Sequence, residues 1–324
     1  MNLRLAFDVL RLVAKGLATW VPGAGYAIDL GAGGKTGSAA YCYGVWLKHL
    51  TLLWQHGMRS MPGTVLELGP GSSLGTGLAA LLSGAERYLA LDAVRYAEPR
   101  LDTLVLHELR RLFESRAPRP VAGWPDYDAC LDERLFPGHI LSDERLCLSL
   151  ASDRLARLES ALLGAYDASP AEPICFRTWE ARRDTGEGEV DLVFSQAVLQ
   201  HVTDVAAVYA QCKRWLKPGG FMSHHVDHSS LGITGAWDGH WQFGEGTWRL
   251  IRGGRPYFIN REPCSTHLRL LRENDFELVG LFRRLRPDAL ARAALAPRWR
   301  GLSEEDAHTH ATFLLARRLG PAPA

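Results

Sequence analysis

The stretch TVLELGPGSSLG, residues 64–75, decides the fold of this 324-residue chain. Five mainly apolar residues lead into the tight turn GPG, and the apolar segment LGTGLAALLSGA follows. This pattern predicts one strand-turn-helix unit. Residues 88–92 then read YLALD, a second apolar strand that ends on an acidic residue. Strands that alternate with helices predict an α/β fold with a mostly parallel sheet and helices on both faces.

The alternation resumes further along the chain. The predicted strands lie at 174–176, 190–195, 221–226, 276–282 and 309–316, and the predicted helices include 204–216 and 266–274. Helix 204–216 stops at the sequence KPGG, because proline cannot continue a helix and glycine accepts the positive φ of the exit. Residues 63–320 are therefore predicted to form one domain around one large core.

A separate helical region is predicted for residues 1–62. It contains an amphipathic helix at 3–20, a glycine-rich turn at 31–37 and an aromatic helix at 41–54. The basic and apolar residues of the first helix suit either packing on the protein's own domain or peripheral contact with a membrane surface. Packing is the favoured alternative, because amphipathic helices are common in soluble proteins.

An insertion at 94–171 interrupts the alternation. It contains two helical patterns, around 102–114 and 143–163, and it is too long for a simple crossover between strands. Two alternatives stay open at this point. The insertion is either a lid that shapes a substrate pocket or a helical buttress on the outer face of the sheet.

Composition and charge exclude several classes of protein. The net charge of +1 provides no strong field for gathering a polyanion, so a nucleic-acid substrate is disfavoured. The six cysteines contain no CxxC pair and are predicted to be reduced thiols. No apolar run has the length of a membrane span, and charged residues interrupt the N-terminal apolar segment. A cytoplasmic location is expected.

The first turn has the features of a nucleotide-cofactor site. Glycines let the backbone approach a ligand closely, and the helix that follows directs its amide groups towards it. Asp92 lies 23 residues after Gly69, where an acidic residue accepts hydrogen bonds from ribose hydroxyls. Glu67 precedes the turn, where its carboxylate would attract an ammonium group and repel a pyrophosphate. These charges favour S-adenosylmethionine (SAM) over NAD as the cofactor.

Four ordered motifs, ELGPGSSLG, LALDAV, DLVFSQAVLQHV and LKPGGFM, resemble those of the class I SAM-dependent methyltransferases. The resemblance covers roughly residues 63–230. It implies a Rossmann-like sheet of seven strands whose last strand is antiparallel and lies beside the fifth, a position that 309–316 would fill. It also implies SAM as the cofactor and S-adenosylhomocysteine (SAH) as the product.

The resemblance also assigns cofactor-binding residues. It places Glu67, Gly69 and Gly71 beside the methionine part of SAM, with Pro70 and Ser72 in the same turn. It places Asp92 on the ribose. Ser195 and Gln196 would lie beside the sulfonium, and Trp179 or Glu180 would contact the adenine. The long insertion shifts the third strand and leaves the adenine assignment open.

Catalytic residues are predicted at the end of the fifth strand, where the sequence reads FMSHHVDHSS. His224, His225, Asp227 and His228 gather there, and alternation along a strand would direct His224 and His228 to one face and His225 and Asp227 to the other. A histidine suits general-base chemistry on a hydroxyl, with an aspartate fixing its orientation. A metal site and a purely structural hydrogen-bonding role are the alternatives.

The methyl acceptor is predicted to be a small molecule, a sugar or a natural-product hydroxyl. Six aromatic residues between 237 and 258 would either stack on such an acceptor or belong to the core. Three other functions stay open. They are N-methyl transfer, which needs no base, a NAD-dependent oxidoreductase, and a non-catalytic SAM-binding protein.

Overall fold

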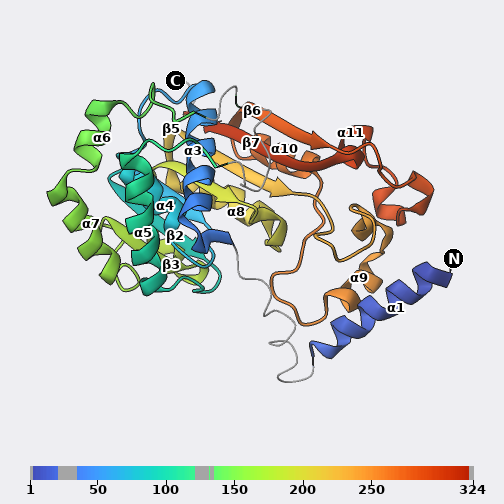
Figure 1. The fold of residues 1–324 in the computed structure, drawn as a ribbon. Helices are drawn as coiled ribbons and strands as arrows, with labels where there is room; N and C mark the ends of the chain where they lie inside the picture. The colour runs from blue at the N-terminus through green and yellow to red at the C-terminus, as the bar shows by residue number, and fades with distance from the viewer. Residues whose placement is uncertain (1–2, 21–34, 121–130, 132–134, 321–324) are drawn as a thin grey trace.

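A seven-stranded mixed sheet forms the centre of the computed structural model, which describes residues 3–20, 35–120, 131 and 135–320 (Figure 1). The strand order is β3-β2-β1-β4-β5-β7-β6. The first five strands run parallel, and β7 is antiparallel to both β5 and β6. The predicted fold and the predicted place of the last strand are therefore confirmed. The strands are β1 (Thr64–Leu68), β2 (Arg87–Asp92), β3 (Ile174–Thr178), β4 (Val190–Gln196), β5 (Leu216–Asp227), β6 (Phe276–Leu285) and β7 (Thr309–Arg318).

Three helices cover the first face of the sheet: α3 (Ala39–Gln55), α4 (Gly75–Leu82) and α5 (Pro99–Glu114). Helix α3 is the predicted aromatic helix, and its Tyr43 and Trp46 are fully buried against this face. Trp46 contacts Phe194 of β4 across a ring distance of 5.9 Å. Helix α3, in the predicted N-terminal helical region of residues 1–62, therefore contributes to the core on this face of the sheet.

Two helices cover the second face: α8 (Val205–Trp215) and α10 (Cys264–Glu273). Side chains alternate along each strand, so Val65 of β1 joins the first core whereas Leu66 and Leu68 join the second. Because both faces are covered, the sheet is open only at its edges and ends. Ligands of open α/β sheets bind at the carboxyl ends of the strands.

The insertion supports the sheet in the part that the structure describes. Helix α7 (Ser152–Gly164) packs on α5 and β3, and the short helix α6 (Asp143–Ser149) contacts α4 (Figure 1). Leu155, Leu158 and Leu162 give α7 a buried stripe at three- and four-residue spacing. These contacts fit the buttress alternative. Residues 121–130 and 132–134 of the insertion lie outside the described part of the chain.

The N-terminal helix α1 (Leu3–Ala18) packs against α9 (Glu245–Arg252) (Figure 1). The contact is close at Gly16, where an added Cβ would lie 1.9 Å from the backbone oxygen of Leu250. This contact fits the expected packing on the protein's own chain. No described helix is both long enough and apolar enough to cross a lipid bilayer. Residues 31–34 of the predicted glycine-rich turn lie outside the described part.

The remaining elements are short. They are η1 (Lys35–Gly37), η3 (Trp179–Thr185), η4 (Leu199–His201), η5 (Gly239–Gln242), η6 (Arg292–Ala294), η7 (Pro297–Trp299) and α11 (Glu304–His308). The five cysteines that the structure describes are free thiols. Among these elements, η1 bears most directly on the site, because it lies against the glycine turn.

Gly77 of α4 provides a test of this packing. A Cβ at Gly77 would lie 2.0 Å from the ring of Tyr88, which is fully buried in β2. We expect Gly77→Ala to lower the free energy of unfolding by about 2 kcal/mol, within the range of about 1–3 kcal/mol for overpacked cores. Gly246 of α9 has no atom within 4 Å of an added Cβ, so Gly246→Ala is the control. Urea unfolding of both variants measures the difference, and equal stabilities would contradict the packing of α4 on β2.

Candidate cofactor and acceptor site

The turn after β1 lies at the carboxyl ends of β1, β2 and β4 and requires glycine twice. Gly69 has φ +66° and Gly71 has φ +75°, in the left-handed region that L side chains avoid. Space is also limiting, because an added Cβ would lie 2.5 Å from Val198 at Gly69 and 2.9 Å from Thr36 at Gly71. Only glycine therefore fits the backbone conformation and the space at these two positions. The turn leads into the first residues of α4.

Helix η1 holds the turn from the N-terminal side. The amide of Ser72 donates to Thr36 Oγ1 at 2.9 Å, and the hydroxyl of Ser73 donates to the Thr36 carbonyl. Asp102 of α5 contributes from another direction, since the amide of Leu74 donates to its carboxylate at 2.7 Å. The turn is therefore fixed by residues that precede and follow it in sequence, and none of these contacts requires a ligand.

The position of Asp92 suits its predicted role, which is to accept hydrogen bonds from the ribose hydroxyls. It ends β2 beside β1, and its two carboxylate oxygens accept the amides of Ala93 at 2.7 Å and Gly71 at 3.4 Å. Each oxygen keeps a further lone pair for a hydroxyl. Burial raises the pKa of this carboxyl, whereas the backbone amides lower it. The residue links the glycine turn directly to the end of the second strand.

Glu67 points to the first face of the sheet. It is 2% exposed, and Tyr88 Oη donates to its carboxylate at 2.5 Å. Burial raises the pKa of Glu67 to about 8, against the lowering effect of the Tyr88 and Thr76 hydroxyls. A carboxyl with this pKa is mainly protonated at pH 7. The immediate partner of Glu67 is therefore a tyrosine and not an ammonium group, and its predicted contact with SAM stays a prediction.

Two further pairs of predicted cofactor residues follow β3 and β4. Ser195 is fully buried and its hydroxyl bonds to His224 Nδ1 at 2.7 Å, whereas Gln196 is half-buried and lies 3.3 Å from a ring nitrogen of His49. Trp179 packs edge-on against Trp215 on the second face of the sheet, and Glu180 is exposed. All four residues lie at or near the carboxyl ends of two parallel strands, β3 and β4, at the same end of the sheet as the glycine turn.

The four predicted catalytic residues divide between the two faces of β5 as alternation requires. His224 lies 6.3 Å from the ring of Tyr209, and His228 lies 5.6 Å from the ring of His267, both on the second face. His224 is 1% exposed, and both ring nitrogens of His228 are hydrogen-bonded, to the Glu262 carbonyl at 3.1 Å and to Thr312 Oγ1 at 3.0 Å. These hydrogen bonds fit the structural alternative for His228, and its predicted catalytic role stays a prediction.

His225 and Asp227 belong to the other set of β5 positions. Ser223, in the same set, bonds to His49 of α3 at 2.6 Å, which places this set on the first face. His225 is fully buried. Asp227 ends the strand, and its carboxylate accepts the amide of Ser229 at 2.7 Å. The general-base role predicted for His224 or His225 is tested by no contact in the structure and remains a prediction.

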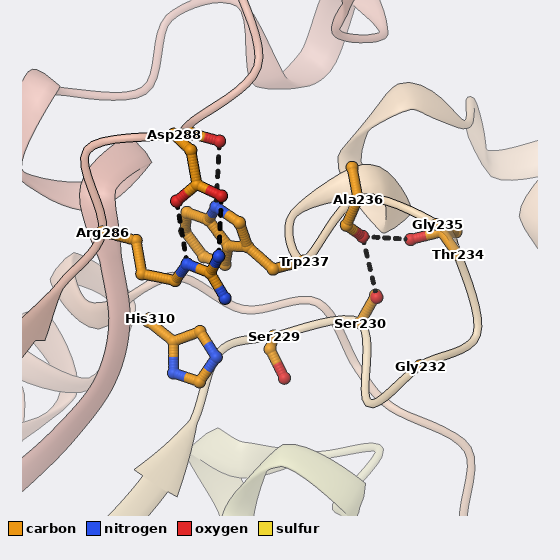
Figure 2. A pocket seen from close by; sticks show the side chains of 10 residues that line it. All are labelled: Ser229, Ser230, Gly232, Thr234, Gly235, Ala236, Trp237, Arg286, Asp288 and His310. Carbon is orange, nitrogen blue, oxygen red and sulfur yellow. Dashed lines mark hydrogen bonds and ion pairs between the residues drawn. The ribbon is translucent and has the colours of Figure 1, made fainter.

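Two cavities lie beside the end of β5. The larger, of about 510 Å³, is lined by Lys35, Tyr41, Asp227, Ser229, Leu231 and His310. The smaller, of about 340 Å³, shares Ser229 and His310 with it and extends to Trp237, Arg286 and Asp288 (Figure 2). Lys35 is next in sequence to Thr36, which holds the glycine turn. Burial raises the pKa of Tyr41, and the nearby Cys42 and Glu67 raise it further. The larger cavity therefore lies at the same end of the sheet as the glycine turn, although none of residues 69–72 lines it.

Several residues of this region were missed by the sequence prediction. Thr36 and Tyr41 lie in segments without a motif, so their contact with the turn depends on the fold. The position of His310 near the site could have been predicted from strand pairing. If the last strand is antiparallel and lies beside the fifth, its first residues lie next to the end of the fifth strand, where the catalytic residues were expected. The observed register pairs Ala311 with Asp227 and bonds the His310 carbonyl to the His228 amide at 2.8 Å.

The metal alternative finds no support at this end of the sheet. Among the residues that the structure describes, no group of three or more histidine, cysteine, aspartate or glutamate side chains is arranged to hold a metal ion. The histidines of β5 diverge to opposite faces of the sheet, because adjacent strand residues point in opposite directions.

Comparison with known proteins identifies the central segment. A family model described as "Methyltransferase domain" matches residues 166–223, which contain β3, β4, α8 and the first part of β5. No curated protein matches the chain.

Similar solved structures are distant in sequence. One is an S-adenosylmethionine-dependent methyltransferase from Mesorhizobium loti, 14% identical, covering 83% of this chain and 96% of that one with a TM-score of 0.40. Another is phosphoethanolamine N-methyltransferase 2 of Haemonchus contortus in complex with S-adenosyl-L-methionine, 14% identical, covering 90% and 59% with a TM-score of 0.43. A third is the CurJ carbon methyltransferase, 13% identical, covering 97% and 67% with a TM-score of 0.42.

The matched segment agrees with the geometry of the sheet and of the glycine turn. The strand order with an antiparallel β7 between β5 and β6 is the arrangement that the resemblance implied, and the glycine turn and Asp92 meet at its carboxyl edge. Together with the match of residues 166–223 to the methyltransferase domain, these features agree with the class I SAM-dependent methyltransferase fold that the resemblance implied.

Proposed function

We propose that this protein transfers the methyl group of SAM to a hydroxyl of a small polar molecule, such as a sugar or a hydroxylated natural product. SAM supplies an electrophilic methyl group on a sulfonium. Methyl transfer is an in-line displacement, so the protein's main tasks are to position the acceptor and to exclude water. The sequence alone left the acceptor open between oxygen and nitrogen, and the lining of the two cavities favours oxygen.

The observation that carries the proposal is the larger cavity at the end of β5, on the same edge of the sheet as the glycine turn. Its described lining combines one hydroxyl, one phenol, one carboxylate, one ammonium and one imidazole with a single leucine. Such a set of donors and acceptors suits a hydroxylated molecule better than an apolar one. The adjoining smaller cavity adds Trp237, whose ring is largely buried against Trp241 and His310 and so gives the cavity a rigid wall.

In this proposal, residues of the chain orient both the methyl donor and the acceptor. Asp92 and the turn at Gly69 and Gly71 would fix the nucleoside and methionine parts of the donor. Tyr41 and Leu231 would cover the acceptor on the side of the larger cavity. A hydroxyl acceptor also has to lose its proton, so a histidine base is part of the proposal. The cavity lining includes one histidine, His310, and one carboxylate, Asp227.

An acceptor screen that measures released SAH tests the proposal. The purified protein is incubated with SAM and with three sets of compounds: phenols and catechols, simple sugars, and primary amines. We expect SAH to form with hydroxyl compounds and not with amines. Turnover of amines alone would favour N-methyl transfer and contradict the proposal. SAM binding without turnover of any compound would favour the non-catalytic alternative.

A further inference from the structure

His310 lines both cavities beside β5. It is the second residue of β7, it shares this position with Ser229, and Figure 2 shows it in the lining of the smaller cavity. Its ring lies 5.4 Å from the ring of Trp237. Its backbone carbonyl is engaged, because the His228 amide donates to it at 2.8 Å. The position is fixed by the sheet, while the half-buried side chain borders the space where an acceptor would lie.

The ring of His310 retains hydrogen-bonding capacity. Its Nδ1 atom is buried and has no hydrogen-bond partner among the residues that the structure describes. The histidines of the sequence motif differ. His224 Nδ1 bonds to Ser195 at 2.7 Å, and both nitrogens of His228 are engaged. Neither His224 nor His225 lines either cavity. Buried polar atoms are normally hydrogen-bonded, so the lack of a described partner leaves the ring without a fixing hydrogen bond at Nδ1, and a ligand in the cavities would meet the accessible part of this half-buried ring.

The charges around His310 favour a neutral ring that can accept a proton. Burial lowers its pKa most, and the Asp227 carboxylate acts in the opposite direction. The titratable and charged groups that face His310 are Asp227 and His225 of β5, His228 directly after β5, Arg284 of β6, and Arg286 and Asp288 beyond β6. Arg286 and Asp288 pair with each other at 2.6 Å, which leaves Asp227 as the carboxylate with the strongest effect on the ring.

We propose that His310 is the general base for the acceptor hydroxyl and that Asp227 is a positioning residue that stabilises its protonated form. The inference rests on the proposed function, since only a hydroxyl acceptor needs such a base. The acceptor oxygen bonds to the methyl carbon as the carbon–sulfur bond breaks, and the electron pair of that bond stays on sulfur. The hydroxyl proton passes to a ring nitrogen of His310, which becomes an imidazolium beside the Asp227 carboxylate.

The test uses the full chain, SAM and a series of para-substituted phenols of increasing acidity, with simple sugars as further acceptors. The variants are His310→Gln and Asp227→Asn. His107→Gln, on the half-exposed surface of α5, is the matched control. For each protein, kcat is measured from SAH release, and SAM affinity is measured by calorimetry. Unchanged SAM affinity shows that a variant is folded and that its cofactor site is intact.

We expect His310→Gln to lower kcat by about 10²- to 10⁴-fold with the least acidic phenol, the usual contribution of a general base. The loss shrinks as the phenol becomes more acidic, because an acidic phenol ionises without help. Asp227→Asn lowers kcat less and moves the acidic limb of the kcat–pH profile to lower pH, because the carboxylate that raised the pKa of the ring is gone. A purely structural role would move neither the phenol dependence nor this limb.

The outcomes separate the two proposals. Full turnover by His310→Gln with an unchanged pH profile would overturn the base assignment and leave hydroxyl methylation standing. Equal losses with every phenol would also overturn it, because such losses indicate a structural role. A wild-type protein that binds SAM but converts no phenol or sugar would overturn the hydroxyl acceptor and the base together.

Discussion

Replacing Asp92 with alanine is expected to lower the affinity for SAM by about 100-fold, because two charge-assisted hydrogen bonds of about 1.5 kcal/mol each are lost. The carboxylate ends β2 beside the glycine turn and accepts the Gly71 amide at 3.4 Å. Asp92→Asn keeps one acceptor oxygen and loses the charge, so a smaller loss of about tenfold is expected. Calorimetric titration with SAM measures both values.

The control for this experiment is Asp153→Ala. Asp153 is exposed on α7, where it lies 3.8 Å from Arg157 at the helix surface, so its removal should leave SAM affinity unchanged. Unfolding curves of all three variants report any loss of fold. Wild-type affinity in Asp92→Ala, with the fold intact, would show that the carboxylate does not hold the ribose.

Acidification from pH 7 to pH 5 is expected to destabilise the fold, because buried histidines become protonated when the chain unfolds; His49, His224 and His228, offset by Glu67, account for about 3 kcal/mol of the loss. Burial lowers the pKa of His49 and His224 to about 3 and that of His228 to about 4. Their unfolded pKa is about 6.5, so the unfolded chain binds more protons between these values and stability is lost as pH falls below about 6.5. Each histidine contributes about 2 kcal/mol over this interval.

Protonation of Glu67 has the opposite effect on the free energy of unfolding and is included in the net change. Its folded pKa of about 8 lies above the unfolded value, so its contribution to stability grows as pH falls, and it offsets roughly one histidine, about 2 kcal/mol. Urea unfolding at a series of pH values measures the net slope.

A pair of variants isolates the contribution of one ring. His224→Gln removes a titrating group and should reduce the pH dependence by about 2 kcal/mol. Ser195→Ala removes the same 2.7 Å hydrogen bond but keeps the ring, so its pH dependence should match the wild type. A flat stability between pH 7 and pH 5 in the wild type would contradict the burial of these histidines as neutral groups.

The fold was largely predictable because its signals are local. The apolar strands, the helix stop at 217–220 and the glycine turn each depend on residues that are neighbours in sequence. The position of Asp92 at the end of β2 was predictable for a related reason, since one strand-turn-helix unit fixes its distance from Gly69 along the chain. The predicted seven-stranded sheet and its antiparallel strand are both present.

The site was less predictable because it depends on contacts between distant segments. Thr36 reaches Ser72 across 36 residues, and Asp102 reaches Leu74 from the next helix. Glu67 shows the same limit in its electrostatics. Its charge was inferred from its position before the turn, but Tyr88 and the surrounding core decide its protonation. His310 lies far from the histidine motif in sequence and beside it only through the pairing of β5 with β7.

The most direct test of the central claim is a crystal structure of the protein with SAH bound. The account predicts SAH over the turn at Gly69 and Gly71, with both ribose hydroxyls within hydrogen-bonding distance of the Asp92 carboxylate and the sulfur directed towards the cavity lined by Tyr41 and His310. Electron density for SAH at any other place, or a ribose that makes no contact with Asp92, would contradict it.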